Sequence, residues 1–183
     1  MATFETLAAK CAAGVAVDLL VAIASVQSGV HPLAVRDGAT LTRIASPGEG
    51  VALAVGAADQ GREVRVGLMG LTERQLRAAG RTLTDGFDAC ASLSAAAAIV
   101  EASHDSAAAP KSSAAAMDRA VARAWWRAGG QFVSLSVLET AIARERTNST
   151  VLAKREIAPS LPKALSPNAT LGVSASEGPT RFR

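Results

Sequence analysis

The sequence predicts a mostly α-helical domain with one short extended element, followed by a disordered C-terminal tail. Apolar residues make up 49% of the 183 residues, many of them Ala, and aromatic residues only 3%. Small side chains of this kind favour closely packed helices. The tail prediction depends on a Ser/Ala/Thr-rich stretch that is punctuated by Pro159, Pro162, Pro167 and Pro179. We therefore expect one domain over residues 3–148 and a tail over residues 149–183.

The first clear helix is predicted over residues 17–28, with Gly29 as its end. Leu20, Ile23 and Gln27 share one face of this helix. Gln27 therefore extends an apolar stripe at the C-terminal end. A polar side chain in that position is expected to line a cleft or to find a hydrogen-bond partner.

Two capping boxes predict the next helices. Ser-Pro-Gly-Glu at residues 46–49 also places Pro at the first helical position, and the helix should end near Gly61. Residues 62–69 then alternate between polar and apolar side chains, which predicts a short strand or extended segment. Thr-Glu-Arg-Gln at residues 72–75 begins a short helix that should end at Gly80.

Three further helices complete the predicted domain, for a total of six or seven. Asp88 is expected to cap the first, which runs to Ser103. Residues 103–116 form a loop or the fraying start of the next helix, which is predicted over residues 117–128. The last helix is amphipathic, and its apolar residues are Phe132, Leu135, Leu138 and Ile142.

Charge and hydropathy exclude several classes of function. The net charge of +3 is mild and no dense Lys/Arg cluster is present, so nucleic-acid binding is not supported. A slightly basic surface would suit a polyanion such as the cell wall, although solubility is the more common reason for it. No apolar run reaches the roughly 18 to 20 residues of a membrane span, so we do not expect an integral membrane protein. No cofactor or metal site is predicted.

The N-terminus does not have the basic and then apolar pattern of a secretory signal peptide. Three explanations stay open at this point. The chain acts in the cytoplasm, it is exported by another route, or its start codon has been assigned too late.

Three segments resemble the motifs of one family. Gln-Ser-Gly-Val-His-Pro-Leu-Ala at residues 27–34 is similar to a helix that ends in Glu-Ser, followed by two variable residues, Asn-Pro and a small residue. Gly-Leu-Met-Gly-Leu-Thr at residues 67–72 is similar to Gly-Leu-Met-Gln-Ile-Asn, and Trp-Arg-Ala-Gly at residues 126–129 to Tyr-Asn-Thr/Ser-Gly. On these residues the chain resembles the lytic transglycosylases of bacterial type IV secretion systems, which have the soluble-lytic-transglycosylase (SLT), goose-type lysozyme-like fold.

The resemblance implies chemistry on peptidoglycan. In this family a single Glu protonates the glycosidic oxygen between N-acetylmuramic acid and N-acetylglucosamine, and then acts as a base to give a 1,6-anhydro product. The acid step needs an apolar setting such as the face with Leu20 and Ile23. This chain has Gln27 at the position of that Glu. An amide cannot transfer the proton, and loss of a general acid typically costs about 10²- to 10⁴-fold in rate.

The resemblance also implies a set of substrate-binding positions. They are Ser28, His31, Gly67, Leu68, Met69, Gly70, Thr72, Trp126 and Arg127. Gly70, Thr72 and Arg127 depart from the family pattern, as His31 does, and together with Gln27 they suggest relaxed selection for catalysis. Core packing of Trp126 with Trp125 is at least as common an arrangement as stacking on a sugar.

The two cysteines, Cys11 and Cys90, permit one disulfide, although composition alone favours two buried thiols. The type IV secretion branch tends to have one cysteine before the catalytic helix and a second in a Phe-Asp-Pro-Cys-like stretch, which is similar to residues 87–90 here. The resemblance therefore implies that the two cysteines pair and that the domain folds in the periplasm.

Other residues of catalytic types have simpler interpretations. Glu49, Glu63 and Glu73 are expected to be capping or surface carboxylates, because most Glu side chains are exposed. Ser-His-Asp-Ser at residues 103–106 is interpreted as a polar loop, since a triad is made by geometry and not by sequence neighbours.

Three hypotheses remain. The protein cleaves or, given Gln27, only binds the glycan strand in a type IV secretion or conjugation system. Alternatively, it is a non-catalytic assembly module that contacts other components of that machinery. The third hypothesis is an unrelated helical protein in which the motifs match by chance.

Overall fold

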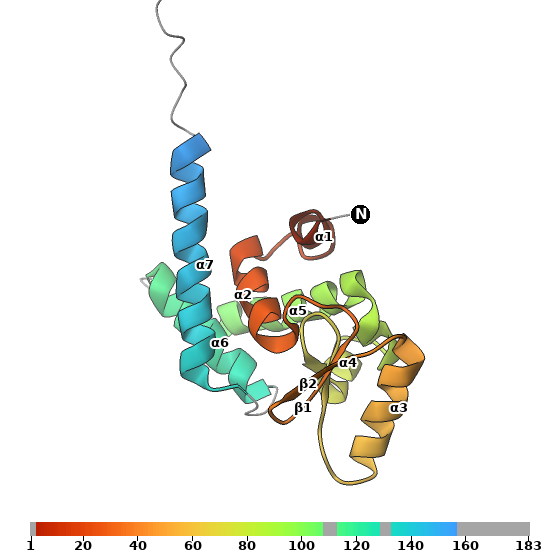
Figure 1. Ribbon diagram of the computed structural model, residues 1–183. Coiled ribbons are helices and arrows are strands. Elements are labelled where there is room, and N and C mark those ends of the chain that lie inside the picture. Colours follow the sequence, from red (N-terminus) through yellow and green to blue (C-terminus); the bar gives the residue numbers. More distant parts are fainter. Residues whose placement is uncertain (1–2, 108–112, 129–132, 157–183) are drawn as a thin grey trace, which may run out of the picture.

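The computed structural model describes residues 3–107, 113–128 and 133–156. Over these residues the chain is mostly helical with a small antiparallel sheet, as the sequence predicts (Figure 1). The helices are α1 (Phe4–Cys11), α2 (Val17–Ser28), α3 (Pro47–Ala58), α4 (Glu73–Ala78), the 3₁₀ helix η1 (Thr84–Phe87), α5 (Ala89–Ala107), α6 (Ala114–Ala128) and α7 (Leu135–Glu156).

The sheet has the order β2-β1-β3-β4, with every described pair antiparallel. The strands are β1 (Ala34–Asp37), β2 (Thr40–Arg43), β3 (Arg65–Val66) and β4 (Leu71–Thr72). The predicted extended segment at residues 62–69 contains β3, but the prediction of a single extended element was wrong. It missed the β1–β2 hairpin, because β2 is exposed along its whole length and has no apolar alternation to reveal it.

Helix α2 lies at the centre of the helical part of the domain. Leu20 and Ile23 are fully buried in it, and α2 packs extensively against the long helix α7 (Figure 1). Arg146 of α7 joins three helices, because its guanidinium donates hydrogen bonds to Asp18 of α2 and to Asp118 of α6. Arg146 thereby ties the first turn of α2, at the opposite end of the helix from Gln27, to α6 and α7.

Several helix boundaries agree with the sequence and others do not. Helix α2 covers the predicted residues, and α3 and α4 begin beside the predicted capping residues. The loop predicted at 103–106 is wrong, since α5 continues to Ala107. Ser103 Oγ donates to the carbonyl oxygen of Ile99 one turn earlier, and so satisfies its hydroxyl within the helix.

At both ends of the domain the structure contains more helix than the sequence predicts. Helix α1 has no counterpart among the predicted helices, and its N-cap is Thr3, whose side chain accepts from the Thr6 N–H. Helix α7 runs to Glu156 and thus past the boundary predicted at residue 148. Residues 157–183, for which we predict a disordered tail, lie outside the described residues.

A disulfide joins Cys11 to Cys90, as the resemblance implies, in place of the two free thiols that composition alone favours. Its Cα atoms are 5.3 Å apart and 79 residues apart in sequence. The bond ties the end of α1 to the start of α5. In the part of the chain that the structure describes, no helix is long and apolar enough to cross a membrane.

Candidate functional site

Two of the three segments that carry the resemblance meet in the structure. The hydroxyl of Ser28, the last residue of α2, donates to the carbonyl oxygen of Leu68 over 2.6 Å, across 40 residues of sequence. Ser28 Oγ also accepts a hydrogen bond from the N–H of His31 at 3.2 Å. Ser28 therefore joins the end of α2 both to the chain that leaves it and to the Gly-Leu-Met segment.

The turn between β3 and β4 depends on two glycines with positive φ. Gly67 has φ +75°, and a Cβ atom there would lie 1.7 Å from the carbonyl oxygen of Gly86. Gly70 has φ +60°, and a Cβ atom there would lie 2.6 Å from Cβ of Gln27. Between them, the N–H of Met69 donates to Ser92 Oγ of α5. The turn is thus fixed from η1, α2 and α5 together.

Gln27 lies in the interior of this cluster, with 3% of its surface exposed. Its side-chain oxygen Oε1 accepts a hydrogen bond from Arg65 Nη1 at 3.4 Å. Its main-chain carbonyl accepts from Arg36 Nε at 2.9 Å, so that a cation from β1 lies at the C-terminal end of α2. The sequence-based expectation of a partner for the Gln27 side chain is met by Arg65.

Arg65 is the residue of this cluster that sequence analysis missed. It is 2% exposed, and Nη1 also donates to the Gly70 carbonyl oxygen at 2.9 Å. Burial lowers the pKa of Arg65 to about 10, while Glu63 raises it and Arg36 lowers it further. Arg65 remains a cation at neutral pH. The signal in the sequence is its position between Val64 and Val66, which places an Arg on the opposite face of an otherwise apolar extended segment.

The remaining predicted site residues fall into two groups. Leu68, Met69 and Thr72 are buried, and Thr72 forms the capping box of α4 with Gln75. His31 and Trp126 are half-buried and Arg127 is exposed. Trp125, and not Trp126, is the fully buried member of the tryptophan pair.

The three glutamates that the sequence predicts to be capping or surface groups lie outside the Gln27 cluster, and two of them form structural contacts. Glu49 accepts the N–H of Ala45 and completes the cap of α3. Glu73 forms an ion pair with Arg77 one turn along α4. Glu63 is exposed at the surface. Among the described residues, no group of His, Cys, Asp and Glu side chains is arranged to hold a metal ion.

The arrangement around Gln27 has a clear chemical consequence. A general acid at this position would have to be held protonated by an apolar setting. Leu20 and Ile23 supply apolar packing on one side, but Arg65 places a cation against the side-chain oxygen. A nearby cation favours the ionised form of a carboxyl group. The cluster can therefore hold an amide in place, and it opposes acid catalysis at position 27.

No family model, no curated protein and no solved structure matches this chain. The resemblance to the lytic transglycosylases therefore rests on the sequence motifs alone.

Proposed function

We propose that this chain is a periplasmic, non-catalytic protein of the lytic transglycosylase type, which binds the glycan strand of peptidoglycan in a type IV secretion or conjugation system. The observation that carries the proposal is the contact of the Gln27–Ser28 helix end with the turn at residues 67–70. These segments are the two best matches to the family, and they are distant in sequence. The Cys11–Cys90 disulfide further supports an oxidising compartment.

The loss of catalysis follows from three residues that act together. Gln27 has no acidic proton to transfer, Arg65 donates a hydrogen bond to its oxygen, and Gln27 fills the space beside Gly70. The family pattern has Gln in place of Gly70. That side chain would collide with Gln27 here, so the two departures from the pattern are coupled by packing.

Burial of the cluster favours the second candidate, a non-catalytic assembly module. Gln27, Leu68 and Thr72 are each at most 3% exposed. A glycan strand could therefore reach only the rim of the cluster. Of the residues that the resemblance assigns to substrate, the half-buried His31 and Trp126 and the exposed Arg127 have surface to offer.

Co-sedimentation with insoluble peptidoglycan tests the proposal. We expect the full chain to sediment with the glycan and to release no 1,6-anhydro-muropeptides. Arg127→Ala should weaken sedimentation. Arg81 is also exposed but is not assigned to substrate by the resemblance, so Arg81→Ala should not weaken it. Release of 1,6-anhydro products would overturn the non-catalytic assignment. If the chain does not sediment with peptidoglycan, glycan binding is overturned, and the non-catalytic assembly module becomes the better proposal.

A further inference from the structure

The chain leaves α2 through two consecutive residues in the left-handed region of backbone conformation. Gly29 has φ +64° and Val30 has φ +61°. Glycine adopts this region readily, whereas the branched side chain of a valine crowds the backbone there and strains it. Within the described part of the chain, Val30 is the one residue other than glycine that has a positive φ. The strain therefore lies at one point, directly after the helix end that contains Gln27 and Ser28.

Hydrogen bonds on both sides of Val30 hold it in this conformation. Its own N–H donates to the carbonyl oxygen of Ala24 at 3.2 Å. The next N–H, that of His31, donates to Ser28 Oγ at 3.2 Å, and Ser28 is anchored in turn to the carbonyl oxygen of Leu68. Packing does not account for the valine, because 40% of its surface is exposed. Strained residues of this kind cluster at ligand sites, so the exposed side chain is the feature that needs a partner.

His31 adds a hydrogen-bond acceptor next to this apolar side chain. Its Nδ1 lies 3.1 Å from the carbonyl oxygen of Leu33. A carbonyl oxygen can only accept, so this contact assigns the proton to Nδ1 and leaves Nε2 as the acceptor of the neutral ring. His31 is half-buried and so keeps exposed surface. Because consecutive Cα atoms lie about 3.8 Å apart, Val30 and His31 can contact the same ligand.

We propose that Val30 and His31 bind one sugar ring of the glycan strand. The Val30 side chain packs against the apolar C–H face of the ring, and His31 Nε2 accepts a hydrogen bond from one of its hydroxyl groups. A sugar ring offers both kinds of contact, an apolar face and hydroxyl groups at its edge. This inference rests on the proposed glycan binding, and it adds Val30, a residue that the resemblance does not assign to substrate.

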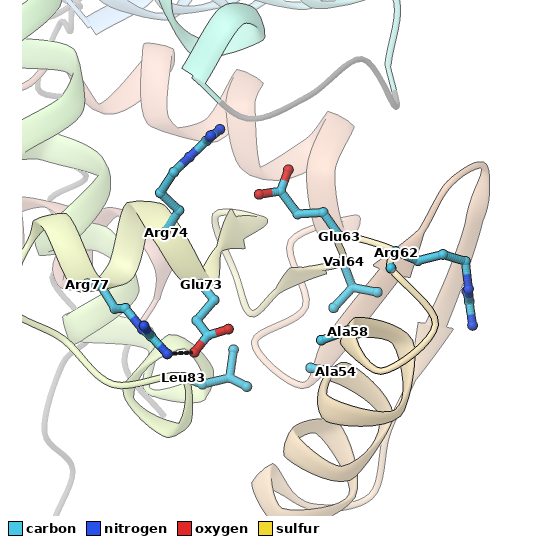
Figure 2. A pocket seen from close by; sticks show the side chains of 10 residues that line it. Ala54, Ala58, Arg62, Glu63, Val64, Glu73, Arg74, Arg77 and Leu83 are labelled. Carbon is cyan, nitrogen blue, oxygen red and sulfur yellow. Dashed lines mark hydrogen bonds and ion pairs between the residues drawn. The ribbon is translucent and has the colours of Figure 1, made fainter.

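The chain also offers an exposed valine without strain as a matched control. Val55 of α3 is 50% exposed and is not among the residues with positive φ. It follows Ala54, which lines a pocket of about 410 Å³ between α3 and α4 (Figure 2). The residues that line this pocket include none of residues 24–33. A substitution at Val55 therefore changes an exposed valine outside the proposed sugar contact.

Val30→Asn separates binding from stability, because Asn adopts the left-handed region more readily than Val and lacks the apolar side chain. We expect the dissociation constant for insoluble peptidoglycan to rise about three- to tenfold, which is less than the loss of a fully buried valine would give. We expect the unfolding temperature to rise by about 2 to 4 °C as the strain is relieved. A residue with only a structural role would not weaken binding while it stabilises the fold. Val55→Asn should leave the dissociation constant unchanged.

His31→Phe tests the acceptor, because it keeps a ring and removes both nitrogen atoms. We expect about three- to tenfold weaker binding, the usual effect of one hydrogen bond. If the parent sediments with peptidoglycan but either variant binds as tightly as the parent, or if Val30→Asn unfolds at a lower temperature, the sugar contact is overturned and glycan binding stands. If the parent does not sediment, glycan binding and the sugar contact are both overturned.

Discussion

Replacing Gln27 by Glu is expected to introduce a carboxylate that stays ionised at neutral pH, and so to leave the protein unable to cleave peptidoglycan. The reason is Arg65, whose Nη1 lies 3.4 Å from the side-chain oxygen at position 27. A single Glu substitution introduces the residue type that the lytic transglycosylases have at the position that Gln27 resembles. It does not restore the protonation state that acid catalysis requires.

The magnitude follows from this distance. Two unit charges 3.4 Å apart attract by about 5 kcal/mol at an effective dielectric constant of about 20, which corresponds to about 3.5 pKa units. Burial acts in the opposite direction, and raises the pKa of a fully buried carboxyl by up to about 3 to 5 units. The cation therefore offsets most of the effect of burial. Without Arg65, burial alone remains, and the carboxyl should shift towards the protonated form.

The assay is a carbon NMR titration of the carboxyl introduced at position 27, with Arg65 present and in an Arg65→Met background. We expect the pKa to be higher by about 3 units in the second background, which is close to the Coulomb value and at the upper end of the usual effect of one adjacent cation. Gln27→Met is the control, because it keeps the size of the side chain and adds no titrating group. Equal pKa values in the two backgrounds, or 1,6-anhydro products from Gln27→Glu alone, would refute the reasoning.

Three further predictions concern stability, and thermal unfolding followed by circular dichroism measures each. Replacing Cys11 and Cys90 together by Ser should lower stability by about 4.5 kcal/mol for the 79-residue separation, and reduction of the parent should have the same effect. Gly67→Ala should cost about 1 to 3 kcal/mol beyond Gly80→Ala, because both have positive φ but of the two only the Gly67 Cβ meets backbone; equal losses would contradict the clash. Arg146→Met should cost about 1 to 2 kcal/mol, since three helices lose charged hydrogen bonds that are partly solvated. An unchanged unfolding temperature for Arg146→Met would show that the packing of the three helices does not depend on Arg146.

The helical part of the fold could be predicted because its signals are local. Helix α2 has apolar residues at helical spacing and ends in the left-handed Gly29. The Ser46 and Thr72 caps fix the starts of α3 and α4. Each of these signals depends on residues within one or two turns of each other, so no tertiary contact is needed to interpret them.

The rest could not be predicted because its causes are non-local. The β1–β2 hairpin is weakly patterned, since only β1 is in part buried. Arg65 is buried because the Gly70 carbonyl and the Gln27 amide surround it, and Gln27 is 38 residues away in sequence. Periodicity identified Gln27 as a polar residue in need of a partner, but nothing near it in the sequence specified a guanidinium.

Positions 27 and 70, at which this chain differs from the lytic transglycosylase motifs, form one packed unit. Gly70 adopts φ +60° with no room for a Cβ atom beside Gln27, so a side chain at 70 requires a different conformation at 27. Arg65 binds both the Gly70 carbonyl and the Gln27 side chain, so a change at either position disturbs the environment of the buried cation. A single substitution at 27 or 70 therefore meets neighbours that fit the present residues. An acid site at position 27 would therefore require a carboxyl group there and removal of the cation at position 65, because the present neighbours hold an amide and oppose a protonated carboxyl.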